Sequence, residues 1–150
     1  MKTITVFTPA YNRAHTLRRA FNSLKAQTCK DFEWLIIDDG STDGTSELVE
    51  RLHEEADFPI RYYWKENGGR HTAVNYSYQF LQTKYVVTLD SDDELTPNAV
   101  ELMIRTWNSI PKERYDHIWC VSGREMDANT LQMVGEPYPK DINEKSGKAQ

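Results

Sequence analysis

The regular alternation of short apolar runs with stretches of helical spacing is the feature that most constrains the fold of this chain. Apolar and β-branched residues gather in short runs at 3–7, 32–37, 61–64, 85–89 and 117–121. Between the runs, mostly apolar side chains repeat at helical spacing, at 17, 20, 21 and 24, at 48, 49 and 52, at 73, 76, 77 and 80 (of which 77 is serine), and at 100, 103, 104 and 107. The short runs are typical of buried strands, and the repeats are typical of helices with one apolar face. Strands that alternate with helices predict an α/β fold, in which right-handed crossovers build a mostly parallel sheet flanked by helices.

Composition and charge exclude several classes of protein. Hydrophobic residues make up 39% of the chain, which is enough for a core and argues against wholesale disorder. The 18 basic residues are outnumbered by 23 acidic ones, giving a net charge of −5, so we expect no nucleic-acid partner. No apolar run approaches the roughly 20 residues that cross a bilayer, and the first residues lack the apolar core of a signal peptide. Because Cys29 and Cys120 are far apart and outside any CxxC pattern, the sequence predicts a cytoplasmic domain with reduced thiols.

The alternating pattern fades after Val121, and the residues that follow are mostly polar. We therefore expect one α/β domain over residues 1–123. Two interpretations stay open for residues 124–150, which form either a loosely ordered tail or the start of a further segment whose partner residues lie elsewhere.

Polar clusters follow the predicted strands at the point where each strand ends. They are TPAYNR at 8–13, DDGS at 38–41, NGGR at 67–70 and DSDD at 90–93. In an open parallel sheet, ligands bind in the crevice at the carboxyl ends of the strands. The clusters therefore predict a single ligand site at one edge of the sheet.

The last of these clusters brings Asp90, Asp92 and Asp93 together directly after an apolar run. Such a concentration of negative charge is repulsive, and a hard divalent cation such as Mg²⁺ or Mn²⁺ would relieve it. These ions take one or two protein carboxylates and fill their remaining positions with water and phosphate oxygens. The alternative is a solvated acidic turn before the helix whose start Thr96 and Pro97 predict.

Asp39 also allows two interpretations. With Asp39 at position 1, Ser41, Asp43, Gly44 and Glu50 fall at positions 3, 5, 6 and 12 of a calcium-binding EF-hand loop. That loop requires a helix on each side, whereas the run before Asp39 is typical of a strand. As a carboxylate at the end of a strand, Asp39 can instead accept a hydrogen bond from the N–H of a nucleobase.

The remaining clusters offer further candidate contacts. Pro9 has a fixed φ that would keep the loop before Tyr11 rigid, and the tyrosine ring could stack on a base or simply pack. Gly68 and Gly69 precede a predicted helix, where free backbone amides would favour phosphate, although paired glycines also form plain turns. Arg70 could contact phosphate or base, or lie solvated at the surface.

Two familiar nucleotide-binding folds lack their motifs here, because no GxGxxG follows the first run and no GxxxxGK[ST] is present. Instead, the chain resembles the amino-terminal, donor-binding portion of a family-two inverting glycosyltransferase, which uses nucleotide sugars and has the Rossmann-like GT-A fold. The resemblance covers about residues 3–123, and its motifs keep the order and spacing of the family. They are TPAYNR at 8–13, DDGSTDGT at 38–45, ENGGRHTAVN at 66–75 and LDSDDEL at 89–95.

The resemblance implies roles for individual residues. It implies a nucleotide-sugar site formed by Pro9, Tyr11, Asp39, Asn67, Gly69, Arg70 and Asp90. In that site Tyr11 would lie against the base, Asp39 would accept the base N–H, and Asp90 would face the ribose or the donor sugar. Asp92, the last residue of the DxD motif, would coordinate Mg²⁺ or Mn²⁺ at the diphosphate, and the adjacent Asp93 would help to orient the water ligands of the metal.

The resemblance also implies an activity, the metal-assisted transfer of a sugar from a UDP-sugar to a hydroxyl of a glycan or lipid-linked acceptor, with inversion. It suggests polysaccharide biosynthesis and peripheral association with the inner face of a membrane. The family's general base and most of its acceptor site lie in a second half, which we expect beyond Gln150. One alternative is a non-catalytic module that binds nucleotide sugars. Another is a nucleotidyltransferase, whose typical glycine-rich, basic first loop TPAYNR does not match.

Overall fold

The computed structural model describes residues 1–111, 125–126 and 133–134. The chain divides into two compact units, Met1–Trp107 and Asn108–Gln150. In the second unit, β5 (Glu125–Met126) and β6 (Met133–Val134) pair in the antiparallel sense. The predicted strand at 117–121 and the predicted domain boundary after residue 123 lie outside the described residues.

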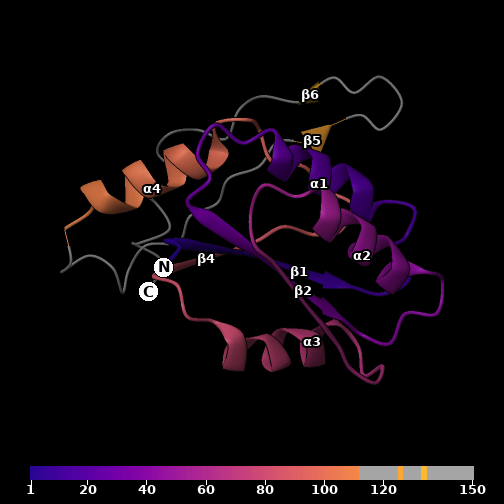
Figure 1. Ribbon diagram of the computed structural model, residues 1–150. Helices are drawn as coiled ribbons and strands as arrows, with labels where there is room; N and C mark the ends of the chain where they lie inside the picture. The colour runs from indigo at the N-terminus through magenta and orange to yellow at the C-terminus, as the bar shows by residue number, and fades with distance from the viewer. Residues whose placement is uncertain (112–124, 127–132, 135–150) are drawn as a thin grey trace. The chain divides into compact units, whose positions relative to one another are not determined.

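The first unit is built on a parallel four-stranded sheet with the order β3-β2-β1-β4 (Figure 1). Its strands are β1 (Ile4–Ala10), β2 (Phe32–Asp38), β3 (Ile60–Trp64) and β4 (Tyr85–Thr88). Its helices are α1 (Leu17–Lys25), α2 (Thr45–Glu55), α3 (Arg70–Ser77) with the 3₁₀ turn η1 (Tyr78–Phe80), and α4 (Ala99–Ser109). Strands and helices alternate as the apolar pattern predicts, and the predicted mostly parallel sheet is confirmed.

Side chains that alternate along the strands build a separate core on each face of the sheet. Ile4, Val6, Trp34 and Ile36 face the larger core, which α1 and α2 cover. Phe7, Leu35 and Ile37 face the smaller core under α3. Figure 1 shows α1 and α2 on one side of the sheet and α3 on the other. The helices that connect the strands therefore cover the faces of the sheet, and loops alone lie at the ends of the strands.

The larger core is rich in aromatic side chains. The ring of Phe21 on α1 lies 6.3 Å from the Trp34 ring and 5.8 Å from the Phe58 ring, and all three side chains are buried. The Trp34 indole N–H donates to Thr8 Oγ1 at 2.9 Å, and the Thr8 hydroxyl donates to the carbonyl of Leu89 at 2.7 Å. This chain of hydrogen bonds connects β2 and β1 with the residue that follows β4.

Pro9 lies inside β1, paired with Ile37, and not in the loop where the sequence places it. The carbonyl of Phe7 accepts the amide of Leu89 on the β4 side, and the carbonyl of Ala10 accepts the amide of Asp39 on the β2 side. The backbone groups of β1 thus point alternately to β4 and to β2, and Pro9 has the same direction as Phe7. Pro9 thus faces the β4 side, where pairing has already ended, and its missing N–H costs no hydrogen bond of the sheet.

Two further observations complete the fold. The helix α4 begins at Ala99, two residues after the predicted start at Pro97, because Pro97 and Asn98 form a turn in which the Ala99 amide donates to the Thr96 carbonyl. Within the described residues, no helix has the length and the apolar character needed to span a bilayer.

Candidate functional site

The register of the sheet brings the polar clusters to one edge. Ala10 pairs with Asp38, and Asp38 pairs with Trp64, so β1, β2 and β3 end side by side. The last residue of β4, Thr88, pairs with Phe7 of β1. All strands run in the same direction, and the loops that follow them therefore meet at the carboxyl edge, as the sequence predicts.

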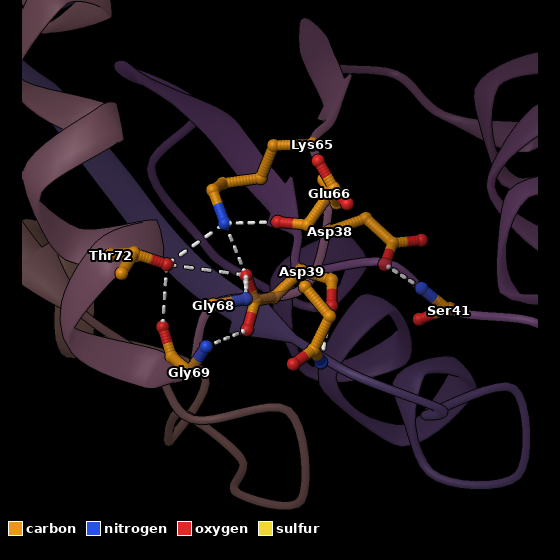
Figure 2. Close-up of polar contacts among 9 residues, drawn as sticks. Asp38, Asp39, Ser41, Lys65, Glu66, Gly68, Gly69 and Thr72 are labelled. Carbon is orange, nitrogen blue, oxygen red and sulfur yellow. Dashed lines mark hydrogen bonds and ion pairs between the residues drawn. The ribbon is translucent and has the colours of Figure 1, made fainter.

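Asp39 is buried directly after β2, and its carboxylate accepts hydrogen bonds from the protein itself (Figure 2). Lys65 Nζ lies 2.5 Å from Oδ1, the Gly68 amide donates to Oδ1 at 3.0 Å, and the Gly69 amide donates to Oδ2 at 2.7 Å. Burial raises the pKa of Asp39, but the bonds from Lys65 and the two amides outweigh it and hold the pKa below its usual value. The carboxylate is therefore ionised at neutral pH.

Lys65 is a residue of the site that sequence reasoning did not find. Its ammonium group contacts Asp39, donates to Thr72 Oγ1 at 2.8 Å and donates to the carbonyl of Glu66 (Figure 2). Only 17% of its side chain is exposed. A signal existed in the sequence, because a lysine that directly follows a strand beside a strand ending in aspartates is placed to neutralise them.

The backbone amides of Gly68 and Gly69 are not free, and the expectation that they are available to phosphate is wrong for this structure. Both donate to Asp39, as described above. Asn67 adds a third contact between the same loops, because its Nδ2 donates to the Asp39 carbonyl at 2.8 Å. The loop after β3 is thus fixed against the end of β2 by polar contacts.

Gly40 makes this close approach possible. Its φ is +85°, and a Cβ atom at this position would lie 2.8 Å from the amide nitrogen of Asn67 and 2.9 Å from the Asn67 Cβ. Glycine adopts positive φ without the steric cost that other residues carry. The loops after β2 and β3 therefore depend on glycine here for both conformation and space.

Asp38, the neighbour of Asp39, accepts hydrogen bonds from the loop after β2 and from β3. It is buried, its Oδ1 accepts the amide of Ser41 at 2.8 Å, and its Oδ2 accepts the hydroxyl of Tyr62 at 2.5 Å. Burial, followed by the contact with Asp38, raises the pKa of Tyr62, so the phenol keeps the proton that it donates. Of the two adjacent aspartates, Asp38 shapes the turn.

The loop after β1 is connected to the loop after β2 by side chains of both. The Asn12 amide donates to Ser41 Oγ at 2.8 Å, the Thr42 amide donates to Asn12 Oδ1 at 2.9 Å, and the Ala14 amide donates to Asp43 Oδ2 at 3.0 Å. Asn12 has a φ of +53°, a left-handed conformation that asparagine tolerates. These contacts position Tyr11, whose side chain is half exposed at the edge of the sheet.

The calcium-loop interpretation of residues 39–50 fails on geometry. The strand β2 precedes Asp39 where an EF-hand needs a helix. Asp43 Oδ1 accepts the amide and the hydroxyl of Thr45, and Ser41 accepts the amide of Asn12. Burial raises the pKa of Asp43, but its bonds to Thr45 and Ala14 outweigh it and lower the pKa overall. These oxygens hold the loops together.

The acidic cluster after β4 does not gather around one point. Arg70 Nη2 lies 2.6 Å from Asp90 Oδ1, and the Asp93 amide donates to the Asp90 carbonyl in a turn. Burial, together with the charges of Asp92 and Asp90, raises the pKa of Asp93. In the described part of the chain, no group of three or more His, Cys, Asp or Glu residues is arranged to hold a metal ion. An ion bound mainly by phosphate needs fewer protein carboxylates, and Asp92, which is exposed, stays a predicted ligand.

A family model described as Glycosyl transferase family 2 matches residues 5–144. The chain belongs to glycosyltransferase family 2. This confirms the predicted family, and the roles of the individual site residues stay predictions.

Family 2 relatives include enzymes much longer than this chain. The chondroitin synthase of Pasteurella multocida (strain Pm70) is 39% identical over 102 residues, which are 68% of this chain and 10% of that protein. An uncharacterised glycosyltransferase of Nostoc sp. (strain PCC 7120) is 34% identical over 140 residues, 93% of this chain and 44% of that protein. The chain thus spans less than half the length of these curated relatives.

Solved structures of family-like transferases confirm the predicted GT-A fold. S. aureus TarS 1–349 in complex with UDP-GlcNAc has a TM-score of 0.66 and 26% identity, covering 72% of this chain and 31% of that chain. The mannosyltransferase PcManGT from Pyrobaculum calidifontis, in complex with GDP-Man and Mn²⁺, has a TM-score of 0.66 and 25% identity, covering 72% of this chain and 32% of that chain. The two neighbours carry different nucleotides, so similarity alone leaves the base undecided.

Proposed function

We propose that residues 1–123 form the nucleotide-sugar-binding part of an inverting, cytoplasmic glycosyltransferase that works at the inner face of a membrane. The enzyme transfers a sugar from a nucleoside-diphosphate donor, UDP-sugar being favoured, to a hydroxyl of a glycan or lipid-linked acceptor. The observation that carries the proposal is the meeting of an ionised, buried Asp39 and a basic-acidic pair, Arg70 and Asp90, at one edge of a parallel sheet. TarS, which binds UDP-GlcNAc, supports this choice of ligand.

The base of the donor is bound at the ends of β1 and β2. Asp39 accepts the N–H of the base, because its carboxylate is held ionised and stationary. Tyr11, which is 50% exposed, offers a ring face for stacking on the base. Pro9, near the end of β1, would lie beside the base, and Asn67 and Gly69 would close this side of the site through their contacts with Asp39.

The diphosphate and the sugar lie toward the end of β4. Arg70 is 64% exposed and its partner Asp90 is 45% exposed, so the pair can part and let Arg70 turn to phosphate and Asp90 to the ribose or sugar. Asp92 would supply a carboxylate to Mg²⁺ or Mn²⁺, and Asp93 would help to orient the water ligands of the ion. When bound, the cation stabilises the charge that develops on the departing phosphate. PcManGT, crystallised with Mn²⁺, supports this assignment.

The reaction requires a carboxylate that takes the proton of the acceptor hydroxyl as this hydroxyl attacks the anomeric carbon. Attack from the face opposite the diphosphate inverts the configuration of the sugar. We place this general base, together with most of the acceptor site, beyond Gln150, as the resemblance to the family implies. The chain described here then contributes donor binding and stabilisation of the leaving group.

Titration calorimetry with UDP tests this proposal on the wild type and on Asp92→Ala, each with and without Mn²⁺. Mn²⁺ is expected to strengthen binding to the wild type, and the enhancement should be lost in Asp92→Ala. Asp57→Ala is the matched control, since Asp57 is exposed and pairs with Lys30 before β3 begins. A folded wild type that binds no UDP in either condition would overturn the proposal.

A further inference from the structure

The two oxygens of the Asp39 carboxylate differ in how many hydrogen bonds they can still accept. A carboxylate oxygen has two lone-pair positions. Oδ1 accepts Lys65 Nζ at 2.5 Å and the Gly68 amide at 3.0 Å, which fills both. Oδ2 accepts only the Gly69 amide, at 2.7 Å, among the described residues. One acceptor position is therefore left on the carboxylate.

Thr72 does not change this count. Its hydroxyl lies 3.3 Å from Asp39 Oδ1, but it also lies 2.8 Å from the Gly69 carbonyl and accepts Lys65 Nζ at 2.8 Å. A hydroxyl has one proton, and the shorter contact with the Gly69 carbonyl takes it. The Thr72 hydroxyl therefore holds the ammonium group of Lys65 against Oδ1, through the contact between these two side chains that Figure 2 draws.

Lys65 cannot leave Oδ1 without cost. The side chains of Lys65 and Asp39 are only 17% and 4% exposed, so this ion pair is largely shielded from water. Removing one partner of a buried pair leaves an uncompensated charge, which is strongly unfavourable. A ligand must therefore bind to the carboxylate while Lys65 still occupies Oδ1.

Resting on the proposed function, in which Asp39 accepts the base, we infer that Lys65 determines base specificity by limiting Asp39 to a base with a single N–H donor at its edge. Uracil and thymine present one donor, N3–H, between two carbonyl acceptors. Guanine presents two neighbouring donors, N1–H and the N2 amino group, which together need both oxygens of a carboxylate. With Oδ1 filled, the amino group of guanine has no acceptor, and a buried donor without a partner is penalised.

Inosine diphosphate separates this mechanism from a simple preference for small bases. Hypoxanthine has the size of guanine but lacks the amino group, and so has one donor at this edge. The wild type, assayed as the full chain by calorimetry with Mn²⁺, should bind UDP and inosine diphosphate each about tenfold more tightly than GDP. Of the two purine nucleotides, inosine diphosphate, whose base lacks the amino group, should therefore bind more tightly than GDP.

Substitution of Lys65 should abolish the difference. In Lys65→Met, Oδ1 becomes available, and the affinity ratio of inosine diphosphate to GDP should fall to about one, while Lys65→Arg should retain the preference. Lys25→Met, at an exposed lysine of α1, should behave as the wild type. If Lys65→Met does not fold, the wild-type ratio decides by itself.

Two outcomes would overturn the inference. The first is a wild type that binds GDP as tightly as inosine diphosphate, and the second is a folded Lys65→Met that keeps the wild-type ratio. Failure of the proposed function gives a different result, because a folded wild type would then bind none of the three nucleotides, and the inference would fall with it.

Discussion

The guanidinium of Arg70 and the carboxylate of Asp90 lie 2.6 Å apart and connect the first residue of α3 to the loop after β4. Both side chains are largely exposed, so the pair contributes at most about 1 kcal/mol to folding. We expect Arg70→Ala to change the free energy of unfolding by no more than this amount, but to weaken UDP binding about tenfold because the proposed phosphate contact would be lost. Urea denaturation and calorimetry measure the two effects.

Arg18→Ala is the matched control for Arg70→Ala. Arg18 pairs with Glu55 at 2.6 Å, with exposed fractions of 38% and 43%, and this pair joins α1 to α2. Its loss should cost a similar, small amount of stability and leave UDP binding unchanged. Equal losses of UDP affinity in the two variants would contradict the role of Arg70.

Gly40 and Gly44 offer a comparison between backbone strain and lack of space. Both have a φ of +85°, but a Cβ at Gly40 meets backbone at 2.8 Å, whereas at Gly44 its nearest neighbour is a Glu47 carboxylate oxygen at 3.7 Å. We expect Gly44→Ala to cost about 1 kcal/mol of unfolding free energy and Gly40→Ala at least about 2 kcal/mol. Urea denaturation measures both costs. Equal costs would show that the short distance between Gly40 and Asn67 does not exclude a Cβ atom at Gly40.

The hydroxyl of Thr8 satisfies the indole N–H of Trp34 in the interior. Thr8→Val keeps the shape but leaves that N–H without its partner, so we expect a loss of about 1–3 kcal/mol of unfolding free energy. Thr8→Ser keeps the hydroxyl and should lose less. Tryptophan fluorescence during urea unfolding follows the transition, and a Thr8→Val variant as stable as the wild type would refute the importance of this bond.

Acid should destabilise the protein through Asp39 and Asp43. Both have pKa values below the ordinary value in the folded state, so each contributes stability above the ordinary pKa of about 3.9 and loses it as the pH falls through the folded pKa. We expect the urea concentration at the midpoint of unfolding to decrease once the pH is lowered below about 4. In Asp39→Asn the midpoint should be lower at neutral pH and should fall less on acidification. An unchanged pH dependence in this variant would exclude Asp39 as a source.

The elements and the position of the site were predictable because burial on one face leaves a period in the sequence. Leu17, Ala20, Phe21 and Leu24 are spaced for one face of a helix, and all four are buried on α1. The apolar run at 32–37 is β2, whose following aspartate lies at the edge where ligands bind to parallel sheets. Periodicity and topology are enough to place such residues.

The partners within the site were not predictable, because they depend on how separate loops meet. The bond between Lys65 and Asp39 joins residues 26 positions apart, and the bond between Asn12 and Ser41 joins residues 29 positions apart. Pro9 illustrates the same limit, since a proline is compatible with β1 only because β4 is the shorter neighbour. Such outcomes follow from strand lengths and loop conformations that no local pattern records.

The pairing of β1 with a strand on each side has a consequence for how a protein of this kind can change. β1 is paired over seven residues with β2 and over four with β4. An insertion of one residue in this strand would send each later side chain of β1 to the opposite face and move its core residues into the wrong core. New ligand preferences must therefore arise through substitutions and length changes in the loops beyond the strand ends, where Lys65 and Asn67 lie. The strands of the sheet therefore tolerate no change of length, whereas the loops at their ends do.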